Sequence, residues 1–153
     1  SMRVLASSVC LVTARDGAGK FHGMAITSAC SLTMDPPAML IAVNRTTSIH
    51  PIICSTGRFC INIMAQKHSA QLEKFSRSDL REKRFDDDAW EPGYLGLPTL
   101  KGALATHSCS VAQSHDFGTH TVFFGAVDDV FVAPEGEADP IIWMNGKGCA
   151  VAM

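Results

Sequence analysis

The sequence predicts a mainly β fold, with strands closed into a barrel and short helices packed outside it. Short apolar runs bounded by glycine, proline and other turn residues recur along most of the chain, and helical spacing of apolar residues is confined to short stretches. The length of 153 residues suits one domain, residues 1–153, with a sizeable core. Apolar residues make up 46% and charged residues 18%, which excludes a disordered chain.

The first half of the chain is expected to hold most of the barrel strands and one helix. The predicted strands cover residues 8–13, 21–27, 38–43 and 58–64, with a hairpin turn at 16–19 and a helix at 49–55. The run AMLIAV at 38–43 is apolar without alternation, which predicts a strand buried on both faces. Gly57 is expected to end the helix that follows Ser48.

The second half is expected to begin with charged helices and to end in long strands. Residues 69–75 carry helical spacing, and Asp79-x-x-Glu82 resembles a capping box for a further short helix. Residues 91–98 are rich in glycine and proline, which predicts an irregular connection. Three more strands are then predicted at 103–114, 120–132 and 141–144, the first two joined by the five residues 115–119.

Charge and cysteine content limit the class of protein. A net charge of −2 without clustered basic residues argues against a nucleic-acid or anionic-membrane surface, and no apolar run is long enough to cross a bilayer. The six cysteines show neither a C-x-x-C pair nor zinc-finger spacing, so no metal site is predicted. Reduced, buried thiols in a cytoplasmic protein are the favoured interpretation.

The residues offer few catalytic motifs. A P-loop, a nucleophile elbow and a complete dinucleotide fingerprint are all missing from the sequence. His107 and Cys109 alternate along one predicted strand, where a structural pair is favoured over metal ligands. His115 and His120 flank the predicted hairpin turn; they are either surface histidines or, for one of them, a group that faces a cleft.

Two polar segments could bind a ligand. Asn44 to Ser48 (NRTTS) places hydroxyl groups, backbone N–H groups and Arg45 ahead of a predicted helix, which suits either a phosphate cradle or an ordinary capped loop. Residues 23–37 (GMAITSACSLTMDPP) gather small and hydroxylated side chains in an otherwise apolar region. This segment is either a surface loop or a wall that a ligand approaches closely.

The order of these features resembles the small flavin reductase family, the reductase components of two-component flavin monooxygenases. The resemblance rests on residues 23–37, then on NRTTS, HPII and GRFCINIM, on KRF at 83–85 and on GTH followed by FFGAV from 118 onward, and it reaches the terminal PIIWMNGKG. It implies an FMN-binding split β-barrel, a six-stranded Greek-key fold. It covers nearly the whole chain.

The resemblance also implies which residues form the site. Small and apolar side chains would line the isoalloxazine ring of the flavin. The NRTTS loop would hold the ribityl chain and the phosphate, and the KRF motif would complete the phosphate or adenine side. The implied cofactor-binding residues are Met24, Thr27, Ser28, Ala29, Ser31, Leu32, Thr33, Asn44, Arg45, Thr46, Thr47, Ser48, Lys83, Arg84, Phe85 and Trp143. His120 matches the histidine of the nicotinamide site and is the implied catalytic residue, with a binding and orienting role.

The implied activity is hydride transfer from NADH or NADPH to FMN or FAD by a homodimer that supplies reduced flavin to a partner oxygenase. The flavin carries the redox step, which agrees with the scarcity of acid–base motifs. The alternative is a flavin- or haem-binding split-barrel protein without nicotinamide turnover. The sequence departs from the family pattern at Ala29, where a bulkier residue is usual, and at Gly148, near which many relatives carry an aromatic residue.

Overall fold

The computed structural model describes residues 1–136 and 139–152. Its strands are β1 (Ser7–Ser8), β2 (Cys10–Arg15), β3 (Phe21–Ile26), β4 (Cys30–Met34), β5 (Pro37–Asn44), β6 (Arg58–Ile63), β7 (Trp90–Pro92), β8 (Pro98–Leu100), β9 (Ala105–Phe117), β10 (His120–Val132), β11 (Ile142–Met144) and β12 (Lys147–Cys149). The α-helices are α1 (Ile49–Thr56) and α2 (Ser69–Ser76), and 3₁₀ helices cover Met2–Val4, Gln66–His68, Ser78–Lys83 and Tyr94–Gly96.

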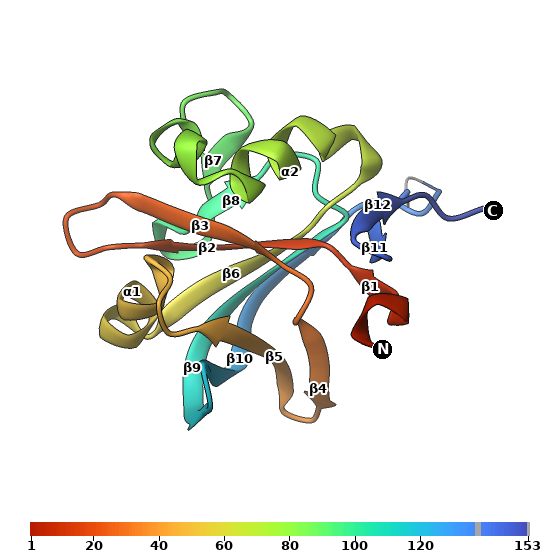
Figure 1. Ribbon diagram of the computed structural model, residues 1–153. Coiled ribbons are helices and arrows are strands. Elements are labelled where there is room, and N and C mark those ends of the chain that lie inside the picture. The colour runs from red at the N-terminus through yellow and green to blue at the C-terminus, as the bar shows by residue number, and fades with distance from the viewer. Residues whose placement is uncertain (137–138, 153) are drawn as a thin grey trace.

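The main sheet confirms the predicted β fold and corrects its details. Seven antiparallel strands lie in the order β3-β2-β6-β9-β10-β5-β4, rather than six, and in the described part of the chain no ladder joins the edge strands β3 and β4 (Figure 1). The sheet is therefore not the closed barrel that was expected. The additional strand, β4, comes from the segment 23–37, whose small hydroxylated residues lack the apolar alternation that predicts a strand.

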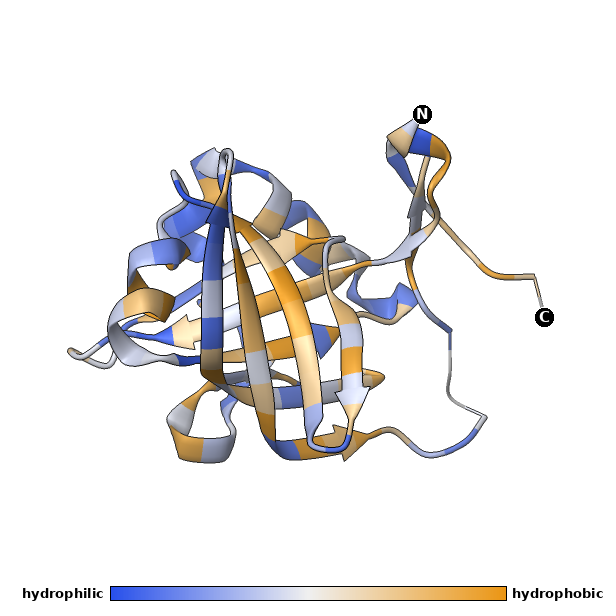
Figure 2. Cartoon of the chain, turned by 90° about the horizontal axis from the view of Figure 1, so that it is seen from below, coloured by the Kyte–Doolittle hydropathy of each residue, from blue (hydrophilic) through white to orange (hydrophobic). Residues whose placement is uncertain are grey.

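Apolar side chains cover both faces of the sheet. One cluster includes Val12, Phe59 and Phe123 and is closed by α1, whereas the other includes Leu11 and Phe75 and is closed by α2. Figure 2 shows apolar residues recurring along the strands of this sheet. Adjacent residues of β2 point to opposite faces, so this strand, rather than the predicted 38–43, is buried on both sides.

Strand β5 corrects the prediction made for 38–43. Ile41 and Val43 are fully buried, while residues 38–40 and Ala42 are only partly buried. The run is apolar throughout because the intervening side chains are largely covered as well. Helix α1 agrees with prediction, and it ends at Gly57, whose left-handed backbone (φ +68°) closes a hydrogen bond from its N–H to the Ile53 carbonyl.

A buried asparagine ties the strands to the outer hairpin β7–β8. The amide nitrogen of Asn62 donates to the Leu11 carbonyl at 2.9 Å and to the Thr13 hydroxyl at 3.2 Å. Its amide oxygen accepts from the backbone N–H of Leu100 at 2.9 Å. Both ends of this fully buried amide are satisfied, which a polar group in a core requires.

Three connections differ from the sequence-based expectation. β9 and β10 run to Phe117 and from His120, so a two-residue link at 118–119 replaces the predicted five-residue loop. Residues 91–98 are not wholly irregular, since they contribute to β7 and β8. Asp79 does not cap its 3₁₀ helix; its carboxylate pairs with Arg77 at 2.7 Å, because a neighbouring guanidinium competes for it.

A small sheet of β1, β11 and β12 lies beside both ends of the chain (Figure 1). The predicted strand 141–144 is thereby confirmed as β11. Arg3 joins the amino-terminal segment to this sheet, because its guanidinium donates to the Asn145 carbonyl at 2.8 Å. Among residues 1–136 and 139–152, the helices are all too short or too polar to cross a membrane.

Candidate functional site

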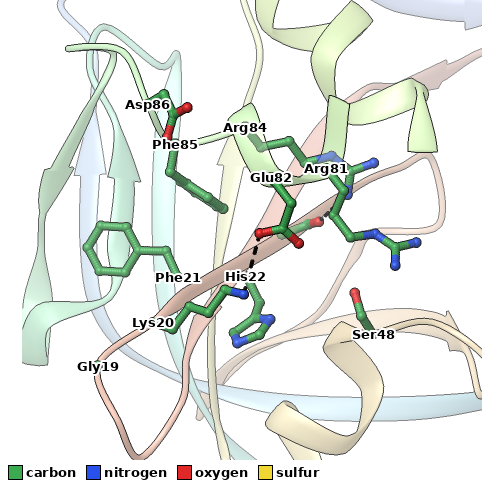
Figure 3. Close-up of a pocket in the computed structure, with 11 residues that line it drawn as sticks. Gly19, Lys20, Phe21, His22, Ser48, Arg81, Glu82, Arg84, Phe85 and Asp86 are labelled. Carbon is green, nitrogen blue, oxygen red and sulfur yellow. Dashed lines mark hydrogen bonds and ion pairs between the residues drawn. The ribbon is translucent and has the colours of Figure 1, made fainter. Parts of the chain in front are cut away.

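A pocket of about 480 Å³ opens between the start of β3 and the 3₁₀ helix Ser78–Lys83 (Figure 3). Residues 19–23 form one wall, residues 81, 82 and 84–86 form another, and Ser48 contributes its hydroxyl from the start of α1. The volume falls in the range of about 300–1,000 Å³ that is typical of small-molecule sites. The pocket therefore brings together three predicted site residues, Ser48, Arg84 and Phe85.

The turn before β3 is held by a single carboxylate. Asp16 Oδ1 accepts from the backbone N–H groups of Ala18 and Lys20, both at 2.9 Å. Asp16 Oδ2 lies 2.9 Å from Nε2 of His22. The His22 hydrogen bond, together with the backbone donors, lowers the pKa of Asp16. This anchoring places Lys20 and His22 on the pocket wall.

Arg84 is a structural residue of this pocket rather than a free charge. Its side chain is buried and donates four hydrogen bonds of 3.1–3.3 Å, and the acceptors are the backbone carbonyls of Gly23, Lys74, Phe75 and Arg77. The guanidinium thereby fastens the segment 74–77 to β3. Its positive charge remains close to the pocket, although four of its five N–H groups donate to backbone carbonyls.

Arg81 is the freer of the two arginines. It is exposed and lines the pocket, and its guanidinium lies on the same side as the Ser48 hydroxyl (Figure 3). Within the described part of the chain, Arg81 forms no ion pair. The nearby pair of Lys20 and Glu82 is long, at 3.7 Å, with side chains 62% and 80% exposed, so it is weak.

The far end of the pocket is aromatic. The rings of Phe21 and Phe85 meet edge to face with centroids 5.5 Å apart, and Phe85 also packs on Trp90 at 4.8 Å. Gly23 gives these rings room, because a Cβ there would lie 2.7 Å from Cε1 of Phe75 and 3.1 Å from Cζ of Phe85. The pocket thus has a basic, hydroxylated end and an aromatic end.

The loop Asn44 to Ser48 holds its shape by internal hydrogen bonds. Asn44 Oδ1 accepts from the backbone N–H of Thr46 at 2.9 Å and from the Thr46 hydroxyl at 2.8 Å. The Thr47 hydroxyl donates to the Asn44 carbonyl at 2.7 Å. Arg45 turns away toward the β9–β10 hairpin, where it donates to the Gly118 carbonyl and pairs with Asp116 at 3.5 Å.

The predicted isoalloxazine wall lies along the edge strand β4 and the link before it. Thr27, Ser28, Ser31 and Leu32 are exposed, and Ser28 donates its hydroxyl to the Ala42 carbonyl at 2.7 Å. Within the described residues β4 is an edge strand, so its side away from β5 presents backbone N–H and C=O groups without a partner strand. A flat, polar-edged ring fits such a surface of small side chains and unpaired backbone groups.

The remaining predicted residues occupy different positions. Met24 and Ala29 pack against the core cluster beneath the wall, and Thr33 accepts a hydrogen bond from the Asp35 backbone. Lys83 is exposed and lies outside the pocket lining. Trp143, from β11, shares a second hollow of about 350 Å³ with Thr27, so the terminal segment does reach the proposed wall.

His120 lies on the loop side of the site. It is exposed at the start of β10, directly opposite Asn44 in the β5–β10 register, and its Nδ1 lies 2.8 Å from the Thr119 hydroxyl. The hairpin mouth therefore brings His120 next to the NRTTS loop. His115 also lies on an exposed part of this hairpin, where its ring packs on Phe124.

Sequence reasoning did not identify Lys20 or His22 as pocket residues. Lys20 and His22 belong to a hairpin that carries no ligand-binding motif, and only the fold places them opposite Ser48. The charge pattern of residues 81–84 suits either a solvated helix face, which was the favoured interpretation, or added charge near a bound anion, and the structure places Arg81 on the pocket wall. The signal available in the sequence was that Arg81 lies four residues before Phe85, on the same short segment. In the structure both residues line the same pocket.

All six cysteines are free thiols, as predicted, but they are not all buried. Burial raises the pKa of Cys10 to about 12 and that of Cys60 to about 11, so these core thiols stay protonated. Cys30 and Cys54 are exposed, because the strand edge and helix face that carry them are uncovered. In the described residues no cluster of three potential metal ligands occurs.

Comparisons with known proteins agree with this arrangement. A family model described as "Flavin reductase like domain" matches residues 2–152. The 4-hydroxyphenylacetate 3-monooxygenase reductase component of Salmonella typhi is 31% identical over 138 residues, 89% of this chain and 81% of its own length. The FMN reductase (NADH) RutF of Pseudomonas syringae pv. syringae is 33% identical over 147 residues, 96% of this chain and 81% of its own length.

Among solved structures, nitrilotriacetate monooxygenase component B from Mycobacterium thermoresistibile superposes with a TM-score of 0.92. The two sequences are 28% identical, and the match covers 99% of this chain and 83% of the other. Fold, motif order and near-complete coverage of the chain agree with one another. They confirm the resemblance on which the site assignment rests: the chain belongs to the flavin reductase-like domain family.

Proposed function

We propose that this chain is an NAD(P)H-dependent flavin oxidoreductase, which transfers a hydride to FMN or FAD and supplies the reduced flavin to a partner monooxygenase. The observation that carries the proposal is the family match over residues 2–152. Relatives named as an FMN reductase (NADH) and as a monooxygenase reductase component support the donor and the partner. The whole of residues 1–153 acts as one domain in this proposal.

The flavin is the substrate, and it supplies the redox chemistry itself. The chain has to bind the flavin ring and the nicotinamide ring in contact with each other. Exposed backbone groups of β4 and the hydroxyls of Thr27 and Ser31 hold the polar edge of the ring. The NRTTS loop, already rigid through its own hydrogen bonds, holds the ribityl chain and the phosphate next to Ser48.

His120 binds and orients the nicotinamide rather than donating an obligatory proton. Its imidazole is exposed beside the NRTTS loop, and the Thr119 hydroxyl fixes one ring nitrogen at 2.8 Å. The second ring nitrogen is then available to the donor molecule. Trp143 approaches from the other side of the wall, through the hollow it shares with Thr27, and shields the two rings from water.

The active form in this proposal is a homodimer in the cytoplasm. Large apolar side chains are exposed at the end of β10, where Val130 and Phe131 are each 53% exposed and Val132 is 67% exposed. A contiguous apolar strand end of this kind suits a protein interface. Free thiols at all six cysteines suit a reducing compartment.

Stopped-flow oxidation of NADH and of NADPH, each with FMN and with FAD, tests the activity. We expect rapid nicotinamide oxidation that depends on added flavin. Absence of oxidation with every pair at saturating flavin contradicts the proposal. Tight flavin or haem binding without turnover would instead identify a ligand-binding module.

The role of His120 is tested separately. His120→Gln is expected to raise the KM for the nicotinamide about tenfold, with little change in flavin affinity, because a hydrogen bond to the donor is lost. His115→Gln, a change at the other exposed histidine of the hairpin, is the matched control and should leave both constants unchanged. Equal effects of the two substitutions contradict the assignment.

A further inference from the structure

A separate pocket of about 250 Å³ lies between the β7–β8 hairpin and the strands β9 and β10. Its lining shares no residue with the proposed flavin and nicotinamide sites. Strand β8 makes its main sheet contacts with β2 and β6. The next strand of the sheet is β9, whose Thr106 is directly opposite Asn62 of β6. The hairpin therefore ends beside Thr106, and the hollow opens there.

Two buried hydroxyl groups line this pocket from β9. Thr106 is 6% exposed and Ser108 is 3% exposed. Within the described residues, the Thr106 hydroxyl has no hydrogen-bond partner, and the Ser108 hydroxyl donates only to Cys60 Sγ, a weak acceptor 3.8 Å away. A buried hydroxyl without a partner destabilises a fold, so its position in a pocket lining points to a ligand.

The lining offers acceptors rather than donors. The Thr99 hydroxyl donates to the Leu97 carbonyl at 3.2 Å, so it presents only its lone pairs to the pocket, as Ser108 does. Glu91 and Asp129 add two carboxylates, and neither forms an ion pair in the part of the chain that the structure describes. A ligand that matches this lining donates hydrogen bonds and carries positive charge.

Each carboxylate stands next to a hydroxyl in the strand ladders. Asp129 is directly opposite Ser108 in the β9–β10 register. Glu91 is directly opposite Thr99 in the β7–β8 register. A ligand with several donors can therefore contact a carboxylate and a hydroxyl on both sides of the pocket.

Two aromatic side chains complete the lining. Tyr94 is 40% exposed and Phe131 is 53% exposed. The face of an aromatic ring attracts cations, and a flat guanidinium group can also stack on it. A metal ion fits less well, because the described residues contain no cluster of three potential metal ligands.

We propose that this pocket binds a small guanidinium compound. The guanidinium group has five N–H donors in one plane, which suits a lining of carboxylates and hydroxyl lone pairs. The volume is just below the range of about 300–1,000 Å³ that holds a drug-sized ligand, so a free molecule with a short alkyl chain fits it. The proposal is independent of the flavin activity, because the two sites share no residue.

Titration of the full chain with 1-butylguanidinium, followed by NMR of the backbone amides, tests the proposal. The comparison ligands are butylurea, which is neutral and nearly the same shape, and butylammonium. We expect butylguanidinium to shift the signals of Gly102 and Thr106 and to bind at least about tenfold more tightly than butylurea, because charge-assisted hydrogen bonds are stronger. Equal binding of the two, absence of binding, or the same shifts with calcium chloride overturns the proposal.

Charge substitutions locate the binding site. Asp129→Asn should weaken butylguanidinium about fivefold, the upper range for an exposed ion pair. Asp128→Asn is the matched control, because Asp128 pairs with Arg58 at 3.7 Å outside the pocket lining. Lys67, whose amino group lies next to Gly102, is a like charge, so Lys67→Gln should tighten binding slightly. Equal effects of the two aspartate substitutions, or weaker binding in Lys67→Gln, overturn the proposal.

The buried hydroxyl is tested by Thr106→Val, which keeps the shape of the side chain. We expect binding to weaken several-fold, while thermal unfolding of the ligand-free protein is not lowered, since no hydrogen bond within the protein is lost. Thr121→Val is the control, because the Thr121 hydroxyl donates to Asp116 Oδ1 at 2.6 Å. It should lower the unfolding midpoint and leave butylguanidinium affinity unchanged. The reverse pattern shows that the Thr106 hydroxyl is structural and overturns the proposal.

A final arm separates the two sources of a guanidinium group. Nα-acetyl-arginine amide represents an arginine side chain of another polypeptide, and butylguanidinium represents a free small molecule. We expect butylguanidinium to bind more tightly, because the pocket is small. Tighter binding of the arginine amide assigns the pocket to a protein partner and overturns the small-molecule assignment. NADH oxidation in Asp129→Asn should equal that of the wild type, so failure of the flavin activity and failure of this proposal are distinguishable.

Discussion

The inner support of the site and the rim of its pocket use polar groups in opposite ways. In the support, Arg84 donates to four backbone carbonyls and Asn44 accepts two hydrogen bonds from Thr46. On the rim, Arg81 is exposed, and among the described residues the side chain of Lys20 has only a long, exposed ion pair. Arg84 and Arg81 are three residues apart, yet one is buried and committed and the other is free.

This difference separates residues that shape the site from residues that are available to a ligand. A buried charge has to be paired within the protein, because leaving it unpaired costs several kcal/mol. An exposed charge is solvated and gives up little when an anion replaces its water. Substitutions in the support should therefore change the free energy of unfolding, and substitutions on the rim should change affinity alone.

Arg84→Ala should produce the largest loss of stability. It leaves four carbonyl groups without their donor and removes the link between β3 and the segment 74–77, so the free energy of unfolding should fall by about 3 kcal/mol or more. Urea unfolding followed by tryptophan fluorescence measures it, since Trp90 donates to the Arg84 carbonyl at 3.1 Å. Arg81→Ala, its counterpart on the rim, should change stability by less than about 0.5 kcal/mol. Equal losses in both variants would remove the distinction.

Gly23→Ala tests the packing under the pocket. The added methyl group would lie 2.7 Å from Cε1 of Phe75 and 3.2 Å from the Val12 carbonyl oxygen, and the backbone atom cannot move away easily. Overpacking of this kind costs about 1–3 kcal/mol. Gly17→Ala is the control, because its added methyl group meets nothing within 4 Å. Thermal unfolding that is unchanged by Gly23→Ala would show that the aromatic cluster is loosely packed.

Asn44→Ala should have a smaller effect, confined to the NRTTS loop. The substitution removes the acceptor for the N–H and the hydroxyl of Thr46, both of which can turn to water, so we expect a loss of about 1 kcal/mol. Asn44→Asp keeps the acceptor and should restore the stability. If flavin affinity falls in Asn44→Ala and recovers in Asn44→Asp, the loop geometry contributes to binding. A full loss in Asn44→Asp would contradict this account.

The fold was predictable where one physical signal dominated. Ser48 before it and Gly57 after it located α1, and apolar runs located most strands. Strand β4 was missed because its residues are small and hydroxylated, and its pairing with β5 comes from the tertiary fold. The β7–β8 hairpin was missed for the opposite reason, since Gly93 and Pro98 are turn residues locally while Asn62 anchors the hairpin from a distant strand.

The site was predictable as a set of motifs but not as a set of roles. Family resemblance pointed to Ser48, Arg84 and Phe85, and the fold places all three in one pocket. The sequence cannot distinguish Arg84 from Arg81, because the two have the same side chain on the same short segment. The distinction depends on which of them faces the carbonyls at 74–77, and that follows from packing of α2 against β3.

The smallest expected effect concerns the turn that presents Lys20. The His22 hydrogen bond lowers the pKa of Asp16, so the ionised carboxylate is favoured in the folded state. Its contribution to stability is complete above the unfolded pKa of about 3.9 and is lost as the pH falls through the lower folded value. His22→Ala should move the carboxyl titration midpoint of Asp16, followed by NMR, back toward its ordinary value.

This shift should be incomplete, because the backbone N–H groups of Ala18 and Lys20 still lower the pKa of Asp16. Added salt should weaken only the part that comes from the charge of His22, since mobile ions screen exposed charges more than short hydrogen bonds. A midpoint that is identical in wild type and His22→Ala would show that the turn alone fixes the carboxylate. In that case His22 is a rim residue, free for a ligand as Arg81 is, and the boundary between support and rim passes between Asp16 and His22.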